Sequence, residues 1–263
     1  MKTYLVESLN AHLFYHDLPG KAPALVMLHG LGSASSSWYP RAAHSPRLRE
    51  HHCLLIDLLG YGYSERPQAF DYAMESQADT VASLLDHLHL DSCVVVGHSM
   101  GGSIAILLAD SRPDLVSHLI VAEGNLDPGP GFVSGRIVTV SEQVFVDSKY
   151  NTFRQQMSDA GYHDYASTVR ASDPVCLYRS AASLIADRTP TYRERLYAMA
   201  MPRTFIFGER TLPDPDEHIL RAQGIDVRIV PGASHDMMGD NPDGFADVIA
   251  DAMSDATTHR TSA

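Results

Sequence analysis

A serine flanked by glycines stands where a strand-like segment meets a helix-like one. Residues 97–102 read Gly-His-Ser-Met-Gly-Gly, directly after the apolar run Val94-Val95-Val96 and directly before a segment with helical periodicity. G-x-S-x-G in that setting is typical of a sharp turn that exposes a nucleophilic hydroxyl. The glycines let neighbouring backbone approach without a Cβ clash, and a helix N-terminus favours developing negative charge. We therefore predict that Ser99 is a catalytic nucleophile.

The base for Ser99 is expected to be a histidine, because a serine hydroxyl is a weak nucleophile until a neighbouring group takes its proton. Among the 14 histidines, His235 is the candidate. It follows the last predicted core strand, so it lies at the same end of the sheet as Ser99. His29 and His98 lie beside the predicted site in sequence, and we expect them to brace loops by hydrogen bonding.

The segments that must position these residues alternate between strands and helices. Short apolar runs predict strands buried on both faces, and two N-terminal segments alternate like half-buried strands. Strands alternating with helices form βαβ units and a mainly parallel sheet, so the predicted fold class is α/β. The predicted strands are 4–9, 12–18, 24–28, 53–57, 93–97, 119–122, 204–207 and 227–230, and the predicted helices are 74–88, 100–111, 216–223 and 242–253.

A stretch of about 80 residues without a convincing strand interrupts this alternation, between 119–122 and 204–207. A structureless loop of that length is rare inside a compact domain. We predict instead a helical insert, residues 127–201, between two core segments, residues 1–126 and 202–263. Its predicted amphipathic helices are 134–160, 162–171 and 173–187.

Four motifs in order make the chain resemble the α/β-hydrolase family. Between them they span residues 27–235. The resemblance implies a mostly parallel eight-stranded sheet flanked by helices, with a helical cap inserted after strand six. The motifs are the loop His29-Gly30-Leu31-Gly32-Ser33, the turn Asp57-Leu-Leu-Gly60-Tyr-Gly62-Tyr-Ser64, the serine turn Gly97–Gly102, and the C-terminal Gly232-Ala-Ser-His235.

The resemblance also implies roles for single residues. It makes Ser99 the nucleophile and His235 the base. It places the oxyanion hole at the backbone N–H groups of Leu31 and Met100, where preorganised donors stabilise the charge of a tetrahedral intermediate.

The acid that should orient His235 is less plainly marked. The family usually places an aspartate shortly after strand seven, but Thr211 stands at that position. Two alternatives are open: Asp214 in the same loop, or Glu123 at the end of strand six, a position that some branches of the family use. A glutamate that ends a buried apolar strand is costly without a partner, and a catalytic histidine would be one. We favour Glu123 and keep Asp214 as the alternative.

The resemblance further implies that the insert covers Ser99 and that the substrate pocket lies between the insert and the core. Trp38, just past the oxyanion loop, and Met237 are the candidate substrate contacts. Candidates for binding a substrate carboxylate are the insert arginines Arg136, Arg154, Arg170, Arg179 and Arg188.

Composition and charge exclude several other classes of protein. A chain that is 44% hydrophobic and 20% charged is neither disordered nor collagen-like, and no segment has the roughly 20 apolar residues of a transmembrane helix. The net charge of −12 works against binding to nucleic acid or to an anionic membrane. The N-terminus lacks the apolar segment of a signal peptide, so we expect a cytoplasmic protein.

The chain shows no motif for a nucleotide, flavin or metal, so no cofactor is expected. The three cysteines are far apart and form no ligand pattern. We expect a monomer or homodimer whose partner is a small-molecule substrate.

Taken together, these residues predict a carboxylesterase-like serine hydrolase. It would cleave an ester-like bond (a carboxylic ester, lactone or thioester) of a small, largely apolar metabolite through an acyl-enzyme. Ser99 excludes a dehalogenase of the usual type, which needs a carboxylate nucleophile. Two alternatives stay open: a hydrolase or lyase that cleaves C–C bonds with the same residues, and a non-hydrolytic member that uses the pocket to bind a ligand.

Overall fold

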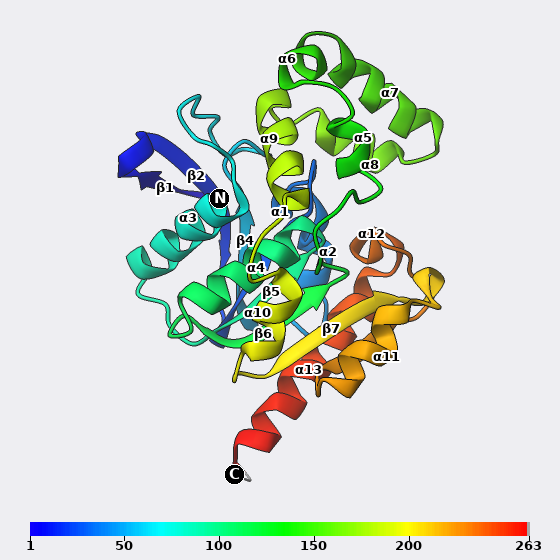
Figure 1. Cartoon of the computed structure of the whole chain (residues 1–263). Helices are drawn as coiled ribbons and strands as arrows, with labels where there is room; N and C mark the ends of the chain where they lie inside the picture. The colour runs from blue at the N-terminus through cyan, green and yellow to red at the C-terminus, as the bar shows by residue number, and fades with distance from the viewer. Residues whose placement is uncertain (262–263) are drawn as a thin grey trace.

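One eight-stranded sheet forms the centre of the molecule, as predicted (Figure 1). The computed structural model describes residues 1–261, so the last two residues of the predicted second core segment, 262–263, lie outside it. The strands are β1 Lys2–Val6, β2 Ala11–Leu18, β3 Lys21–Leu28, β4 His51–Asp57, β5 Cys93–His98, β6 Val116–Ala122, β7 Arg203–Gly208 and β8 Asp226–Val230.

The first strand is shorter than the predicted 4–9. It ends at Val6, because Glu7–Leu9 form a 3-10 turn and Asn10 takes a left-handed backbone conformation with φ 46°. This turn reverses the chain into β2, which pairs antiparallel with β1.

The sheet order is β1-β2-β4-β3-β5-β6-β7-β8, and every pair from β4 to β8 is parallel. In such a sheet the carboxyl ends of the parallel strands share one edge, which is where α/β folds place their ligands. The loops that leave β3, β5, β6, β7 and β8 at that edge carry Leu31, Ser99, Glu123, Thr211 and His235 respectively. The topology therefore brings the predicted site residues Leu31, Ser99, Glu123 and His235 to one edge of the sheet, together with Thr211.

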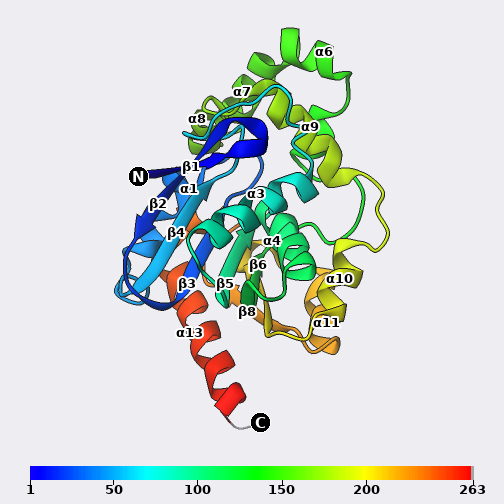
Figure 2. The ribbon, with the colours of Figure 1, turned by 90° about the vertical axis from the view of Figure 1, so that its left-hand side faces the viewer.

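Alternate residues of the central strands face two apolar layers. Val95 and Val121 belong to a core with α3 (Met74–His87) and α4 (Met100–Ser111), which lie together on one side of the sheet (Figure 2). Val94 and Ile120 belong to the opposite core, formed with α2 (Pro40–Ala43) and α13 (Pro242–Thr261). Val94–Val96 and Leu119–Ala122 are therefore apolar on both faces of the sheet, which is why these parts of β5 and β6 read as unbroken apolar runs.

Shorter helices complete the core: α1 Ser35–Trp38, α11 Pro215–Ala222 and α12 Met237–Asp240. Among residues 1–261, no helix is long and apolar enough to span a membrane.

The helices of the insert lie together beyond the end of the sheet that carries the loops, in both views (Figures 1 and 2). The prediction of one helix over 134–160 is wrong. Val138–Val140 break it, and Ser141 starts a new helix by accepting a hydrogen bond from the backbone N–H of Val144. The elements are α5 Ser134–Ile137, α6 Glu142–Val144, a π-helical turn Phe145–Lys149, α7 Tyr150–Asp159, α8 His163–Val169 and α9 Pro174–Ile185.

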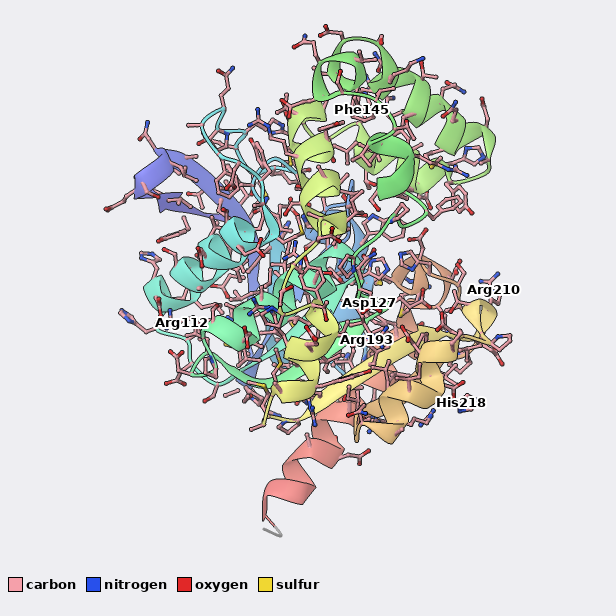
Figure 3. All side chains as sticks on the ribbon, viewed as in Figure 1. Arg112, Asp127, Phe145, Arg193, Arg210 and His218 are labelled. Carbon is pink, nitrogen blue, oxygen red and sulfur yellow. The ribbon has the colours of Figure 1, made fainter. Side chains whose placement is uncertain are left out.

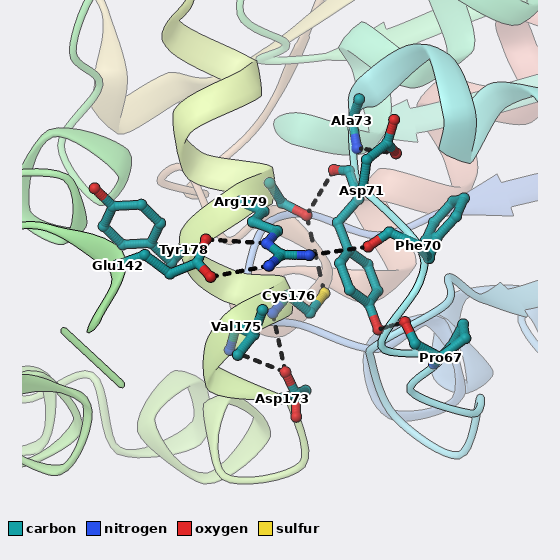
Figure 4. Close-up of polar contacts among 12 residues, drawn as sticks. Pro67, Phe70, Asp71, Ala73, Glu142, Asp173, Val175, Cys176, Tyr178 and Arg179 are labelled. Atoms are coloured by element: carbon teal, nitrogen blue, oxygen red, sulfur yellow. Dashed lines mark hydrogen bonds and ion pairs between the residues drawn. The ribbon is translucent and has the colours of Figure 1, made fainter. Parts of the chain in front are cut away.

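Helix α9 joins the insert to the core (Figure 4). Its N-cap, Asp173, accepts hydrogen bonds from the backbone of Val175 and Cys176, as expected for a cap that precedes proline. The Arg179 guanidinium forms two bonds with Glu142 of α6, 2.9 and 3.0 Å long, and a third to the carbonyl of Phe70 in the core. One side chain therefore ties α9 both to the insert and to the loop before α3.

The last helix of the predicted insert belongs to the core. Helix α10 (Tyr192–Ala198) packs against α4, and Arg195 forms an ion pair with Asp110 of that helix. Arg193 pairs with Asp127, where the chain enters the insert, and both lie beside the sheet, far from Phe145 in the insert helices (Figure 3). The part of 127–201 that lies over the site is thus the segment from Gly131, just before α5, to α9.

Candidate active site

The Ser99 turn has the strained geometry that its glycines predict. Ser99 has φ 51° and ψ −119°, a conformation that residues with a side chain rarely adopt. A Cβ on Gly97 would lie 2.2 Å from the carbonyl oxygen of Gly101, and a Cβ on Gly101 would lie 2.3 Å from that of Leu28. Only glycine fits at either position, so the tight turn places the Ser99 side chain at the start of α4.

His235 and Glu123 form a short hydrogen bond, although they are 112 residues apart in the chain. The distance from Nδ1 of His235 to Oε2 of Glu123 is 2.6 Å. A carboxylate has no proton to donate, so Nδ1 carries the hydrogen and Nε2 is left free to accept one. The His235 side chain is 49% exposed and lines the cavity described below, whereas Glu123 is 11% exposed behind it.

Glu123 is held by two further donors. Its Oε1 accepts the backbone N–H of Gly208 over 2.8 Å and the hydroxyl of Thr211 over 2.5 Å. Its backbone is left-handed, with φ 45°, which turns the side chain out of the line of β6. Thr211, which replaces the expected aspartate, therefore contacts the acid instead of supplying it.

Asp214, the alternative acid, has another role. Its carboxylate accepts the backbone N–H of Asp216 over 2.8 Å and caps α11. The cap fixes the side chain at the start of that helix, and it makes no hydrogen bond to His235. The geometry favours Glu123 over Asp214.

The contact between His235 and Glu123 shifts the pKa of each residue in the direction that favours its ionised form. Burial opposes ionisation of Glu123, but the hydrogen bonds and charge of His235, with the donors Thr211 and Gly208, lower its pKa. Burial also opposes a charged His235, but the hydrogen bond and charge of Glu123, with a smaller effect of Asp236, raise the pKa of His235. The site is built to stabilise an imidazolium at this position.

Two more histidines brace the site, as predicted. His98 donates from Nε2 to the backbone carbonyl of His235 over 2.9 Å, which links the serine turn to the histidine loop. Burial, then the charge of His235, lowers the pKa of His98 to about 3, so its ring is neutral. His29 accepts the backbone N–H of Leu58 at Nε2 and donates from Nδ1 to the carbonyl of Gly30.

The N–H groups of Leu31 and Met100 are available at the site. Met100 is the first residue of α4, where the backbone N–H has no partner within the helix. Within residues 1–261, neither N–H donates a hydrogen bond to another group of the chain. Leu31 and Ser99 line the same cavity, and Met100 follows Ser99 directly.

A cavity of about 500 Å³ lies between the core loops and the insert. This volume is in the usual range for a small-molecule site. Within residues 1–261, no hydrogen bond joins the Ser99 hydroxyl to His235, but both residues line the cavity. The other core residues on its wall include Gly30, Leu31, Ser33, His98, Glu123, Asn125, Thr211, Ser234 and Asp236, and those from the insert include Phe132, Val133, Ser134, Met157, Tyr162, Tyr165 and Leu184.

The predicted substrate contacts Trp38 and Met237 do not line this cavity. Met237 is fully buried in the core with α13, and Trp38 packs between the two cores, so close to Gly239 that a Cβ there would lie 2.8 Å from its ring. Both predictions were wrong because proximity to a motif in sequence does not decide which way a side chain points. None of the five insert arginines lines the cavity either.

Comparison with known proteins decides the family. Residues 23–214 match the family model described as alpha/beta hydrolase fold, which is well over half of the chain. The chain belongs to the α/β-hydrolase family. Mouse sn-1-specific diacylglycerol lipase ABHD11 is 28% identical to this α/β hydrolase over 90% of the chain and 83% of its own length.

Solved structures agree with this assignment at the level of the fold. An esterase from Thermogutta terrifontis superposes with a TM-score of 0.80 over 97% of this α/β hydrolase and 99% of its own chain, at 20% identity. An enol-lactonase from Burkholderia xenovorans LB400 superposes with a TM-score of 0.77 over 96% and 100%, also at 20% identity.

Some residues of the site were not identified from the sequence. Tyr165 and Asp236 line the cavity, and Thr211 contacts Glu123. The only signals were that Asp236 follows His235 directly and that Thr211 replaces an expected acid. Among residues 1–261, no group of three or more His, Cys, Asp or Glu side chains is arranged to hold a metal ion.

Proposed function

We propose that this α/β hydrolase is a carboxylesterase-like enzyme that cleaves an ester, lactone or thioester bond of a small metabolite through an acyl-enzyme. The observation that carries the proposal is the 2.6 Å bond from His235 to Glu123, with His235 in the same cavity wall as the strained Ser99 turn. A binding protein has no need of a histidine with a raised pKa beside an activated serine turn.

In the first half of the reaction, the Ser99 hydroxyl oxygen attacks the carbonyl carbon of the substrate, and its proton passes to Nε2 of His235. The new oxyanion is stabilised by the N–H groups of Leu31 and Met100. Glu123 stabilises the imidazolium. His235 then returns the proton to the leaving oxygen or sulfur, the bond to the carbonyl carbon breaks, and Ser99 is left acylated.

In the second half, His235 takes a proton from water, and the hydroxide attacks the acyl carbon. The collapse of this second tetrahedral intermediate releases the acid and returns the proton to Ser99. The Ser99 to His235 hydrogen bond is expected to tighten with substrate bound, because such bonds are often long in free enzymes.

A fluorophosphonate probe with intact-mass readout tests the proposal directly. The wild-type protein should gain one probe mass, and Ser99→Ala should gain none. Ser111→Ala, at the far end of α4, is the control and should label fully. Folded protein that does not label would refute an activated serine, and it would leave the ligand-binding alternative in place.

A series of p-nitrophenyl esters with increasing acyl length then measures the substrate range. We expect turnover to peak at short chains, because about 500 Å³ has no room for a long-chain acyl group together with its alcohol. Labelling without hydrolysis of any ester in the series would point to C–C bond cleavage instead.

A further inference from the structure

One part of the cavity wall is polar and takes no part in the proposed reaction. It consists of Tyr165 from α8 of the insert and Asp236, which follows His235. Tyr165 is only 8% exposed, and its hydroxyl makes no hydrogen bond within residues 1–261. A buried hydroxyl without a partner is unfavourable, so it points to a bound group that completes it.

The Tyr165 hydroxyl lies against the oxyanion loop. A Cβ on Gly32 would be 2.6 Å from the hydroxyl oxygen, and Gly32 directly follows Leu31. Gly32 has φ 73°, so both its backbone and its lack of a side chain make room for the phenol. A substrate held at the Leu31 N–H therefore has Tyr165 as a close neighbour.

Asp236 brings a carboxylate to the same region. Its side chain makes no hydrogen bond or ion pair within the described residues, although its backbone carbonyl accepts the N–H of Gly239 over 2.8 Å. Burial raises the pKa of Asp236; the charge of His235 opposes this shift, and the charges of Asp240 and Glu123 reinforce it. Two effects raise the pKa of Tyr165: burial, which is the larger, and the charge of Asp236. The two side chains therefore interact.

Among residues 1–261, no lysine or arginine lines the cavity to balance this charge. Two of the insert arginines are paired elsewhere: Arg179 with Glu142, and Arg188 with Glu75. Arg136 lies over the Phe132 ring, 4.1 Å from its centre, but is not part of the wall. Within the part of the chain that the structure describes, the cavity wall thus carries two carboxylates, Glu123 and Asp236. Glu123 is hydrogen-bonded to His235, whereas Asp236 interacts with His235 through its charge alone.

We infer that Tyr165 and Asp236 form a subsite that binds a cationic ammonium group of the substrate, so that the enzyme prefers cationic esters to neutral ones of the same shape and disfavours anionic ones. The carboxylate supplies the opposite charge, and the aromatic ring of Tyr165 supplies a face that attracts cations. This inference rests on the proposed function and narrows its substrate class.

The test uses matched substrates that differ in charge. On the leaving-group side these are acetylthiocholine, S-(3,3-dimethylbutyl) thioacetate and S-(2-carboxyethyl) thioacetate. On the acyl side they are the p-nitrophenyl esters of 4-(trimethylammonio)butanoate, 5,5-dimethylhexanoate and glutarate. In at least one series, wild-type kcat/KM should be about ten- to hundredfold higher for the cation than for its neutral isostere, the range expected of an interaction with one buried charge.

Substitutions of Asp236 and Tyr165 test whether these two residues cause the preference for cations. Asp236→Asn should bring the cation-to-neutral ratio close to one. Tyr165→Leu, which removes the aromatic face, should reduce the ratio, whereas Tyr165→Phe keeps the face and should change it less. Asp164→Asn is the matched control, because it removes an exposed charge next to Tyr165 and should keep the wild-type ratio. A wild-type ratio near one in both series, or a preference for the anion, would overturn the inference.

A binding measurement separates this inference from the proposed function. Calorimetric titration of acetylthiocholine into Ser99→Ala needs no turnover, and its affinity should fall with Asp236→Asn added. Binding of this kind in a protein that hydrolyses none of the esters would refute the proposed reaction alone. Hydrolysis of the neutral esters without a preference for cations would refute the subsite alone.

Discussion

Thr211 donates its hydroxyl to Oε1 of Glu123 over 2.5 Å, while Oε2 of the same carboxylate contacts His235 over 2.6 Å. The family usually carries its acid in the loop after β7. Here that loop supplies Thr211, which donates a hydrogen bond to Glu123, the candidate acid at the end of β6. The two strands are neighbours in the sheet, so either can deliver a carboxylate to the same histidine.

Thr211 should act as a positioning residue. In Thr211→Val the Glu123 carboxylate loses one of its donors. We expect kcat to fall about tenfold with little change in KM, because the hydroxyl contacts Glu123 and not the substrate. Thr211→Ser keeps the hydroxyl and should restore most of kcat. Equal losses in the two variants would show that the methyl group, and not the hydrogen bond, is what matters.

The two candidate acids should respond differently to substitution. Glu123→Gln should lower kcat by about 10²- to 10⁴-fold, because the amide cannot stabilise the imidazolium. Asp214→Ala should leave kcat near the wild-type value and reduce the free energy of unfolding by about 1 kcal/mol, the usual cost of a lost N-cap. Steady-state kinetics and urea denaturation measure both effects. Full activity in Glu123→Gln would contradict our assignment.

The pH dependence follows from the pKa of His235. The histidine must be neutral to accept the Ser99 proton, and Glu123 raises its pKa above the ordinary 6.5. His235 therefore stays protonated, and inactive as a base, up to a higher pH than an ordinary histidine. As a result, kcat/KM should rise with pH through a midpoint above 6.5. In Glu123→Gln the two largest effects that raise the pKa of His235 are lost, and burial is opposed only by the smaller effect of Asp236, so the residual activity should show a lower midpoint. An unchanged midpoint would mean that another group controls the acid limb.

The glycines of the serine turn should differ in their tolerance of a side chain. In Gly101→Ala the new Cβ would meet the Leu28 carbonyl oxygen at 2.3 Å, and backbone cannot move away cheaply. We expect loss of activity and a large drop in Tm. Gly102→Ala, the matched control in the same helix, has its nearest neighbours at 3.0 Å and should lose less. The reverse order, measured by thermal unfolding, would contradict the role assigned to Gly101.

The sequence by itself determined the strands, the serine turn and the position of His235 in the fold. These depend on local chemistry: apolar runs that must be buried on both faces, and glycines that no other residue can replace. The break in the insert was missed, because α5 ends at Ile137 and Ser141 starts the next helix inside a segment with continuous amphipathic character.

Only the tertiary structure shows which carboxylate contacts His235 and which residues line the cavity. Glu123 and Asp214 looked alike as candidates, but one contacts His235 across 112 residues of chain and the other caps its own helix. Trp38 and Met237 lie close to the motifs in sequence, yet they pack into the core, while Tyr165 arrives from the insert. Side-chain partners of this kind depend on how strands and inserts are placed in space, which no local pattern encodes.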